Sequence, residues 1–127
     1  MPTILIADDE PHIRLLLEQT LEDLEEKGVE LLTANNGADA LSMIKEKSPE
    51  LVFLDVMMPK MDGFEVCDIV KNKLGMKHVY IVMLTAKGQE VDRKQGVGLG
   101  ADVYMTKPFD PDEVVKMAKT ILGIEDG

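Results

Sequence analysis

The chain has 127 residues, 45% of them hydrophobic, and a formal net charge of −10 at pH 7. A chain of this length is expected to form one domain, and its apolar content is ample for a packed core. The negative charge argues against direct binding to nucleic acid or an anionic membrane, because phosphate groups would be repelled. Cys67 is the single cysteine and no apolar run approaches the ~20 residues of a membrane span, so we expect a cytoplasmic protein without an internal disulfide.

The first half of the chain alternates strand-like and helix-like segments. Short apolar runs at residues 3–7, 29–34 and 51–55 are typical of strands, and the unbroken run that Asp55 closes is typical of a strand buried on both faces of a parallel sheet. Between these runs, apolar residues recur at helical spacing, first as far as Gly28 and then as far as Ser48. We therefore expect two helices to connect the first three strands.

A third helix is expected after the loop that follows residue 55. Asp62 and Glu65 have the spacing of a capping box, with Asp62 as the cap. The apolar residues behind them that should face the core are Val66, Ile69, Val70 and Leu74. The pattern ends near Gly75, which can terminate a helix.

Two further strands and a weak helix follow. Residues 79–84 and 101–105 are apolar runs of strand length. The segment 89–99 has helical character, but Gly96 and Gly98 would each cost about 1 kcal/mol relative to alanine in a helix interior. We expect this fourth helix to be the least stable one.

The final helix begins with Asp110 as a cap and Pro111 in its first turn, and Gly123 ends it. Five strands that alternate with five helices predict an α/β fold whose strands pair in parallel through right-handed crossovers. We expect one domain over residues 1–123, with residues 124–127 forming a tail or the start of a linker.

Polar side chains follow the strands of the predicted sheet. Asp8 and Asp9 come directly after the first strand, Asp55 closes the third, Thr85 follows the fourth and Lys107 comes just after the fifth. The carboxyl ends of parallel strands lie at one edge of a sheet, where ligands bind in open α/β folds. We therefore expect these five side chains to converge.

Three carboxylates in one place repel each other. Two unit charges ~4 Å apart cost about 4 kcal/mol at an effective dielectric constant near 20. Lys107 would supply one positive charge and a divalent cation two more. Oxygen ligands with open positions suit Mg²⁺, and carboxylates, Mg²⁺, a hydroxyl and a lysine together predict a phosphoryl-transfer site with one carboxylate as the nucleophile.

The same motifs carry a family resemblance. Asp8-Asp9, the run 54–59 with Met61-Asp62-Gly63, Thr85-Ala86 and Lys107-Pro108-Phe109 resemble the motifs of response-regulator receiver domains of two-component signalling. The resemblance covers essentially the whole chain, in the order and spacing of that family. It implies a flavodoxin-like fold with a five-stranded parallel sheet in the order 2-1-3-4-5 and helices on both faces.

The resemblance also implies the role of each acid. Asp55 would accept a phosphoryl group from a histidine kinase or a phosphotransfer protein. Asp9 and Asp55 would bind Mg²⁺ directly and Asp8 through water, while the backbone carbonyl of Met57 would complete the protein's share, with Mn²⁺ as an acceptable substitute.

Four further positions match the family pattern. Thr85 and Lys107 would contact the phosphoryl oxygens, and Tyr104 matches the aromatic residue that swings inward as Thr85 moves. The bond between Lys107 and Pro108 would be cis, which is the minor isomer for most X–Pro bonds.

The implied function is a phosphoacceptor switch. It would catalyse its own phosphorylation and dephosphorylation without being a conventional enzyme, and would shift an output face made of the fourth helix, fifth strand and fifth helix. A downstream protein or a fused output domain would read that face, and phosphorylation-dependent dimerisation is an open alternative.

Two other classes of function stay open. A Mg²⁺-dependent phosphohydrolase with an aspartate nucleophile commonly has a second aspartate two residues on, where this chain has Met57. A phosphorylation-independent binding module would keep the fold without the chemistry. The acids Asp8 and Asp9 could also be ordinary caps of the first helix, and Lys107 a solvated surface lysine.

Overall fold

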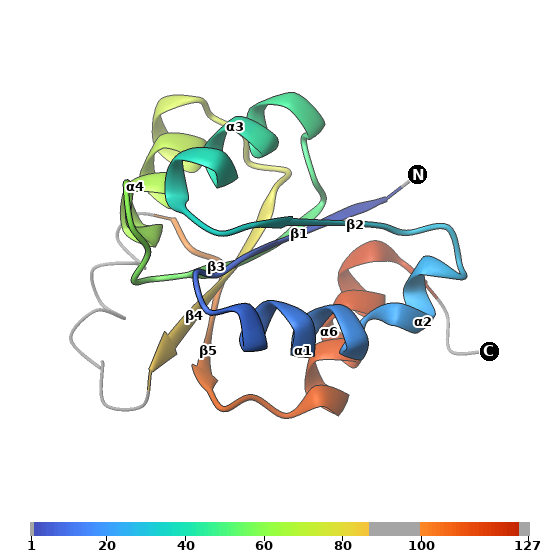
Figure 1. The fold of residues 1–127 in the computed structure, drawn as a ribbon. Helices are drawn as coiled ribbons and strands as arrows, with labels where there is room; N and C mark the ends of the chain where they lie inside the picture. The colour runs from blue at the N-terminus through green and yellow to red at the C-terminus, as the bar shows by residue number, and fades with distance from the viewer. Residues whose placement is uncertain (1, 87–99, 125–127) are drawn as a thin grey trace.

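A computed structural model describes residues 2–86 and 100–124 of the chain. Its centre is a five-stranded sheet in the order β2-β1-β3-β4-β5, in which all neighbouring strands are parallel (Figure 1). The strands are β1 Thr3–Ala7, β2 Glu30–Ala34, β3 Leu51–Asp55, β4 Tyr80–Ala86 and β5 Val103–Lys107. The predicted α/β fold and its strand order are confirmed.

Helices cover both faces of the sheet (Figure 1). They are α1 Pro11–Thr20, α2 Glu22–Glu25, α3 Gly37–Lys47, α4 Gly63–Asp68, the π-helix η1 Ile69–Lys73 and α6 Pro111–Leu122. Leu5 and Ala7 of β1 belong to the hydrophobic cluster under α3 and α4, whereas Ile4 and Ile6 belong to the cluster under α1 and α6. Because β1 is buried on both faces, its sequence is a continuous apolar run.

The limits of the strands agree with the sequence to within one or two residues at each end. The strand predicted over residues 101–105 begins at Val103 and ends at Lys107, because its last two residues still pair with residues 85–86 of β4. This pairing places Lys107 inside the sheet rather than just after it. The helix predicted over residues 89–99 lies outside the described residues.

The capping residues predicted from sequence are confirmed. Asp62 accepts a hydrogen bond from the backbone N–H of Glu65 at 2.9 Å, and Asp110 accepts one from Asp112 at 2.9 Å. Gly123 ends α6 in the left-handed conformation, with φ of 70°.

The first helix is shorter than predicted. The periodic pattern indicates one helix as far as Gly28, but α1 ends at Thr20 and the four-residue α2 follows after Leu21. Leu21 is buried and has φ of −98° and ψ of 4°, which interrupts the helical geometry. Leu16, although apolar, is 41% exposed because it lies beside the buried stripe rather than in it.

The third helix differs from the prediction at its end. The backbone N–H of Leu74 donates to Ile69 O at 2.7 Å, five residues back, so the last turn is a π-helix. The extra residue in this turn rotates the following side chains. Leu74, which was predicted to be buried, is therefore 45% exposed, while Val66 and Val70 keep their places in the core.

The same π-helical turn places Lys71 inside the protein, where it is only 4% exposed. Its Nζ lies 2.8 Å from Oδ2 of Asp102, the residue that precedes β5. Asp102 Oδ2 also accepts a hydrogen bond from the backbone N–H of Ile81 at 2.8 Å. The buried ion pair therefore joins η1 to the start of β5 and to β4, and nothing in the sequence pattern singles it out.

The helices in residues 2–86 and 100–124 are all too short or too polar to traverse a lipid bilayer.

Candidate functional site

Two aspartates lie side by side at the carboxyl edge of the sheet. Ala7 of β1 pairs with Leu54 of β3, so the residues that follow them, Asp8 and Asp55, are neighbours. Asp8 is fully buried and Asp55 is 5% exposed. The central position of β1 and β3 in the sheet produces this placement, because both strand ends open onto the same edge.

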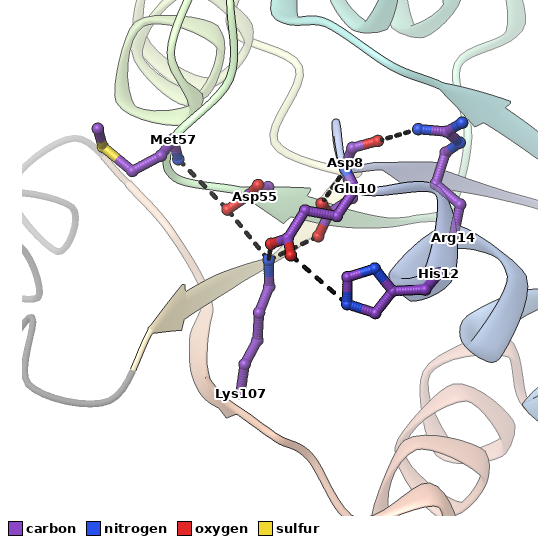
Figure 2. Close-up of polar contacts among 7 residues, drawn as sticks. All are labelled: Asp8, Glu10, His12, Arg14, Asp55, Met57 and Lys107. Atoms are coloured by element: carbon purple, nitrogen blue, oxygen red, sulfur yellow. Dashed lines mark hydrogen bonds and ion pairs between the residues drawn. The ribbon is translucent and has the colours of Figure 1, made fainter.

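Lys107 reaches these aspartates from the end of β5 (Figure 2). Its Nζ lies 2.8 Å from Asp8 Oδ2, 3.2 Å from Glu10 Oε1 and 3.5 Å from Asp55 Oδ1. The side chain is largely buried. Lys107 is therefore not a solvated surface lysine, which was the alternative that the sequence left open.

Glu10 is a member of the site that the sequence analysis did not select. It is the N-cap residue of α1, but its side chain makes no capping hydrogen bond and turns toward Lys107 instead (Figure 2). Asp8 Oδ1 accepts a hydrogen bond from the backbone N–H of Glu10 at 2.9 Å, which orients this turn. Neither Asp8 nor Asp9 is the N-cap residue of α1, because Glu10 holds that position.

Four carboxylates gather here. Asp8, Asp9, Glu10 and Asp55 each offer one oxygen, and these oxygens all lie within 4.8 Å of one another. When all are ionised they leave a formal excess of three negative charges over Lys107. Asp8 Oδ2 is buried and accepts no hydrogen bond of good geometry, although the Lys107 ammonium pairs with it at 2.8 Å.

This donor set fits a divalent cation. It consists of carboxylate oxygens, and two of the four acids are exposed, so water or a substrate oxygen could complete the coordination. The incompletely satisfied Asp8 oxygen and the excess negative charge both favour a bound cation over an empty cluster.

The environment perturbs the ionisation of the site. Burial, together with the neighbouring Asp8 carboxylate, raises the pKa of Asp55 to about 7, and Lys107 offsets only part of this rise. Burial alone would lower the pKa of Lys107, but its contacts with Asp8, Asp55 and Glu10 outweigh burial and raise it. Lys107 therefore stays charged when Asp55 begins to take up a proton.

Met57 follows Asp55 in the loop between β3 and α4. Its backbone N–H donates to Asp55 Oδ1 at 3.3 Å, and its side chain is exposed (Figure 2). Gly63 closes this loop by donating to Val56 O at 2.8 Å. A Cβ at Gly63 would collide with the backbone carbonyl of Asp55, so only glycine allows this close approach.

The remaining predicted residues lie on β4 and β5. Thr85 is 4% exposed and follows Leu84, the residue of β4 that pairs with Asp55. Tyr104 is partly buried and packs against the cluster under α3 and α4. The Lys107–Pro108 bond is cis, the isomer that the family resemblance implies.

The fold and the site together define a flavodoxin-like α/β protein with an acidic, lysine-containing site at the carboxyl edge of its sheet. The chain belongs to the response regulator receiver domain family, whose model matches residues 4–119. It is thus a receiver domain of the two-component response-regulator type.

Curated relatives agree with this assignment. The chain is 46% identical over 119 residues to the alkaline phosphatase synthesis transcriptional regulatory protein PhoP of Bacillus subtilis (strain 168), covering 94% of this chain and 48% of that protein. It is 44% identical to the probable transcriptional regulator ycf27 of Porphyra purpurea, with 94% and 46% covered. The chain spans about half the length of the curated relatives it matches.

Solved structures have the same fold. A putative response regulator from Chloroflexus aurantiacus J-10-fl is 35% identical with a TM-score of 0.83, and the match covers 97% of this chain and 99% of that one. The chemotaxis protein CheY4 of Vibrio cholerae is 31% identical with a TM-score of 0.81, over 95% and 98% of the two chains.

Proposed function

We propose that Asp55 accepts a phosphoryl group from a phosphohistidine on a histidine kinase or a phosphotransfer protein. The single observation that best supports this proposal is the convergence of Lys107 and the acid cluster on the buried Asp55 carboxylate. Transfer to a carboxylate needs a counter-charge for the incoming phosphoryl oxygens, and Lys107 supplies one at this edge.

The transfer is a displacement at phosphorus. An oxygen of Asp55 forms the new P–O bond while the P–N bond to the donor imidazole breaks, and the imidazole nitrogen keeps that electron pair. Lys107 and the Thr85 hydroxyl contact phosphoryl oxygens. Self-dephosphorylation is a hydrolysis. Water attacks phosphorus, the P–O bond to Asp55 breaks, and inorganic phosphate and a proton leave.

Asp9, Asp55, Asp8 through water and the backbone carbonyl of Met57 are the groups proposed to hold Mg²⁺, with Mn²⁺ as a substitute. When bound, the cation supplies positive charge to the phosphoryl oxygens as the transfer proceeds. The fit rests on the oxygen-only donor set and on the negative charge that Lys107 leaves uncompensated.

Phosphorylation would be read at an output face that includes β5 and α6; the fourth predicted helix, which the sequence assigns to the same face, lies outside the described residues. Tyr104 on β5 is the residue proposed to move with Thr85. The relatives are named as transcriptional regulators, which supports a fused output domain or a downstream protein as the reader. Dimerisation on phosphorylation is a further proposal. The charge of −10 supports an absence of direct contact with nucleic acid or membranes.

A cytoplasmic location fits the presence of a single cysteine, the buried Cys67, which cannot form an internal disulfide.

The test is the intact mass of the protein after incubation with Mg²⁺ and acetyl phosphate. We expect one labile phosphoryl adduct in the wild type and in the control Asp62→Asn, whose side chain can still cap α4, and no adduct in Asp55→Asn or in EDTA. Rapid turnover of external phosphate esters would instead support the phosphohydrolase. A wild type without an adduct would support the passive binding module.

A further inference from the structure

Glu10 competes with Asp55 for the ammonium of Lys107. Lys107 Nζ lies 3.2 Å from Glu10 Oε1 but 3.5 Å from Asp55 Oδ1, and it is closest to Asp8, at 2.8 Å (Figure 2). In this arrangement Lys107 is directed toward Asp8 and Glu10 more than toward the carboxylate that would become phosphorylated.

The side chain of Glu10 does not stabilise α1 through a capping hydrogen bond. Its backbone carbonyl accepts from the N–H groups of Ile13 and Arg14 and so begins the helix, while the carboxylate makes no capping bond. Its second oxygen lies 3.5 Å from Nε2 of the exposed His12. The carboxylate is therefore available to interact with Lys107 at the mouth of the site.

Glu10 and Asp8 differ in how easily they can release Lys107. The Glu10 side chain is 46% exposed, so water can solvate its carboxylate once the ion pair is broken, whereas the Asp8 side chain is fully buried. An exposed ion pair is weak, and a buried carboxylate that loses its partner is costly. Of these two partners, Glu10 is the one that can leave.

We propose that Glu10 is a positioning residue that holds Lys107 in the unphosphorylated site and releases it when Asp55 takes up a phosphoryl group. This inference rests on the proposed function. A phosphoryl group adds negative charge at Asp55, which attracts Lys107 and repels the Glu10 carboxylate. The contact between Glu10 and Lys107 therefore slows phosphorylation.

The kinetic test uses acetyl phosphate as the donor, with Mg²⁺ saturating for each variant. An Asp55 oxygen bonds to phosphorus as the P–O bond to the acetyl group breaks, and acetate leaves with the electron pair. We expect Glu10→Gln to form the adduct up to about five-fold faster than the wild type, the most that one exposed ion pair supplies. Glu22→Gln, which neutralises an exposed acid on α2, should leave the rate unchanged.

The variant Glu10→Asp distinguishes the effect of the contact with Lys107 from the effect of the negative charge at position 10. Aspartate keeps the negative charge but is one methylene shorter, so the contact with Lys107 is lost. The proposal requires Glu10→Asp to be faster than the wild type, as Glu10→Gln is. If Glu10→Asp behaves like the wild type while Glu10→Gln is faster, long-range repulsion explains the effect and the proposal is overturned. It is also overturned if Glu10→Gln is no faster, or slower.

A second readout needs neither metal nor donor. The side-chain NMR signal of Lys107, identified by its loss in Lys107→Met, should shift in metal-free Glu10→Gln and Glu10→Asp but not in Glu22→Gln. An unshifted signal in both Glu10 variants would overturn the inference. If the signal shifts but no variant, wild type included, forms an adduct, the proposed phosphoacceptor function fails while the resting contact stands.

Discussion

At the scale of single residues, Asp55 is a group whose ionised form is unfavourable in the folded protein without metal. Burial and Asp8 raise its pKa from 3.8 to about 7. Because the folded pKa is above the unfolded one, the carboxyl destabilises the fold as pH rises from about 4 to about 7, and the full penalty remains above pH 7.

Asp55→Asn should therefore increase the free energy of unfolding in EDTA. The gain is about 2 kcal/mol at pH 5 and reaches at most about 4 kcal/mol at pH 8, since each pKa unit corresponds to about 1.4 kcal/mol. Urea unfolding of wild type and variant at both pH values measures it, with Asp62→Asn as the control for replacing an aspartate outside the site. A gain equal at pH 5 and pH 8 would contradict the raised pKa, and Mg²⁺ should reduce the gain at pH 8.

The identity of the central residues was predictable, because an acid, hydroxyl or lysine at the end of a parallel strand can only face one edge of the sheet. Asp8, Asp55, Thr85 and Lys107 were selected in this way. Glu10 was not, because an acid at the start of a helix is equally well explained by the helix dipole. Its role depends on the direction of a flexible side chain, which the sequence pattern does not contain.

At the scale of elements, the strands and caps follow the sequence closely because burial and capping are local requirements. The end of the third helix does not. The widening to a π-helix, which buries Lys71 and exposes Leu74, is favoured by Asp102, a partner 31 positions further along the chain. The periodicity of apolar residues within one helix cannot predict a contact with a residue so far along the chain.

The pair between Lys71 and Asp102 should be asymmetric in its energetics. Asp102→Asn keeps an acceptor for Ile81 but leaves the 5% exposed Lys71 side chain without a counter-charge, so we expect a loss of about 3 kcal/mol in unfolding free energy. Lys71→Met leaves a 30% exposed carboxylate that still accepts from Ile81, at a cost of about 1 kcal/mol.

Urea unfolding of the two variants measures this difference. Lys73→Met is the matched control, because that side chain is 69% exposed and its distance to Asp68 is 4.0 Å. It should change stability by less than about 0.5 kcal/mol. Equal losses for Asp102→Asn and Lys71→Met would contradict the asymmetry.

At the scale of the whole molecule, the fold class and strand order were predictable because alternating strands and helices allow few topologies and the family motifs select one of them. Contacts between side chains of segments that are distant in the sequence were not predictable. The order β2-β1-β3-β4-β5 gathers acids from β1 and β3 and a lysine from β5 at one edge. The charge balance of that edge is a property of the assembled sheet rather than of any one segment.

Mg²⁺ should therefore stabilise the folded protein as a whole. A ligand that binds only the native state at 100 times its Kd adds about 2.7 kcal/mol. Thermal unfolding with and without MgCl₂ measures the shift in Tm, and NaCl at matched ionic strength corrects for screening of the charge of −10. Asp9→Asn should lose most of the Mg²⁺-specific shift. A shift as large as that of the wild type would exclude Asp9 as a ligand.

Lys107 and Glu10 are 97 positions apart. Among the described residues, Lys107 is the ammonium that pairs with the acid cluster, and β5, which carries it, comes after the other four strands of this sheet in the chain. A growing or truncated chain that stops before β5 would hold mutually repelling acids at an open sheet margin, with β4 unpaired on one side. Pairing of β5 with β4 and partial neutralisation of the acid cluster by Lys107 are thus one event, and a product cut short upstream of residue 107 should be left as a target for proteolysis rather than as a partly active domain.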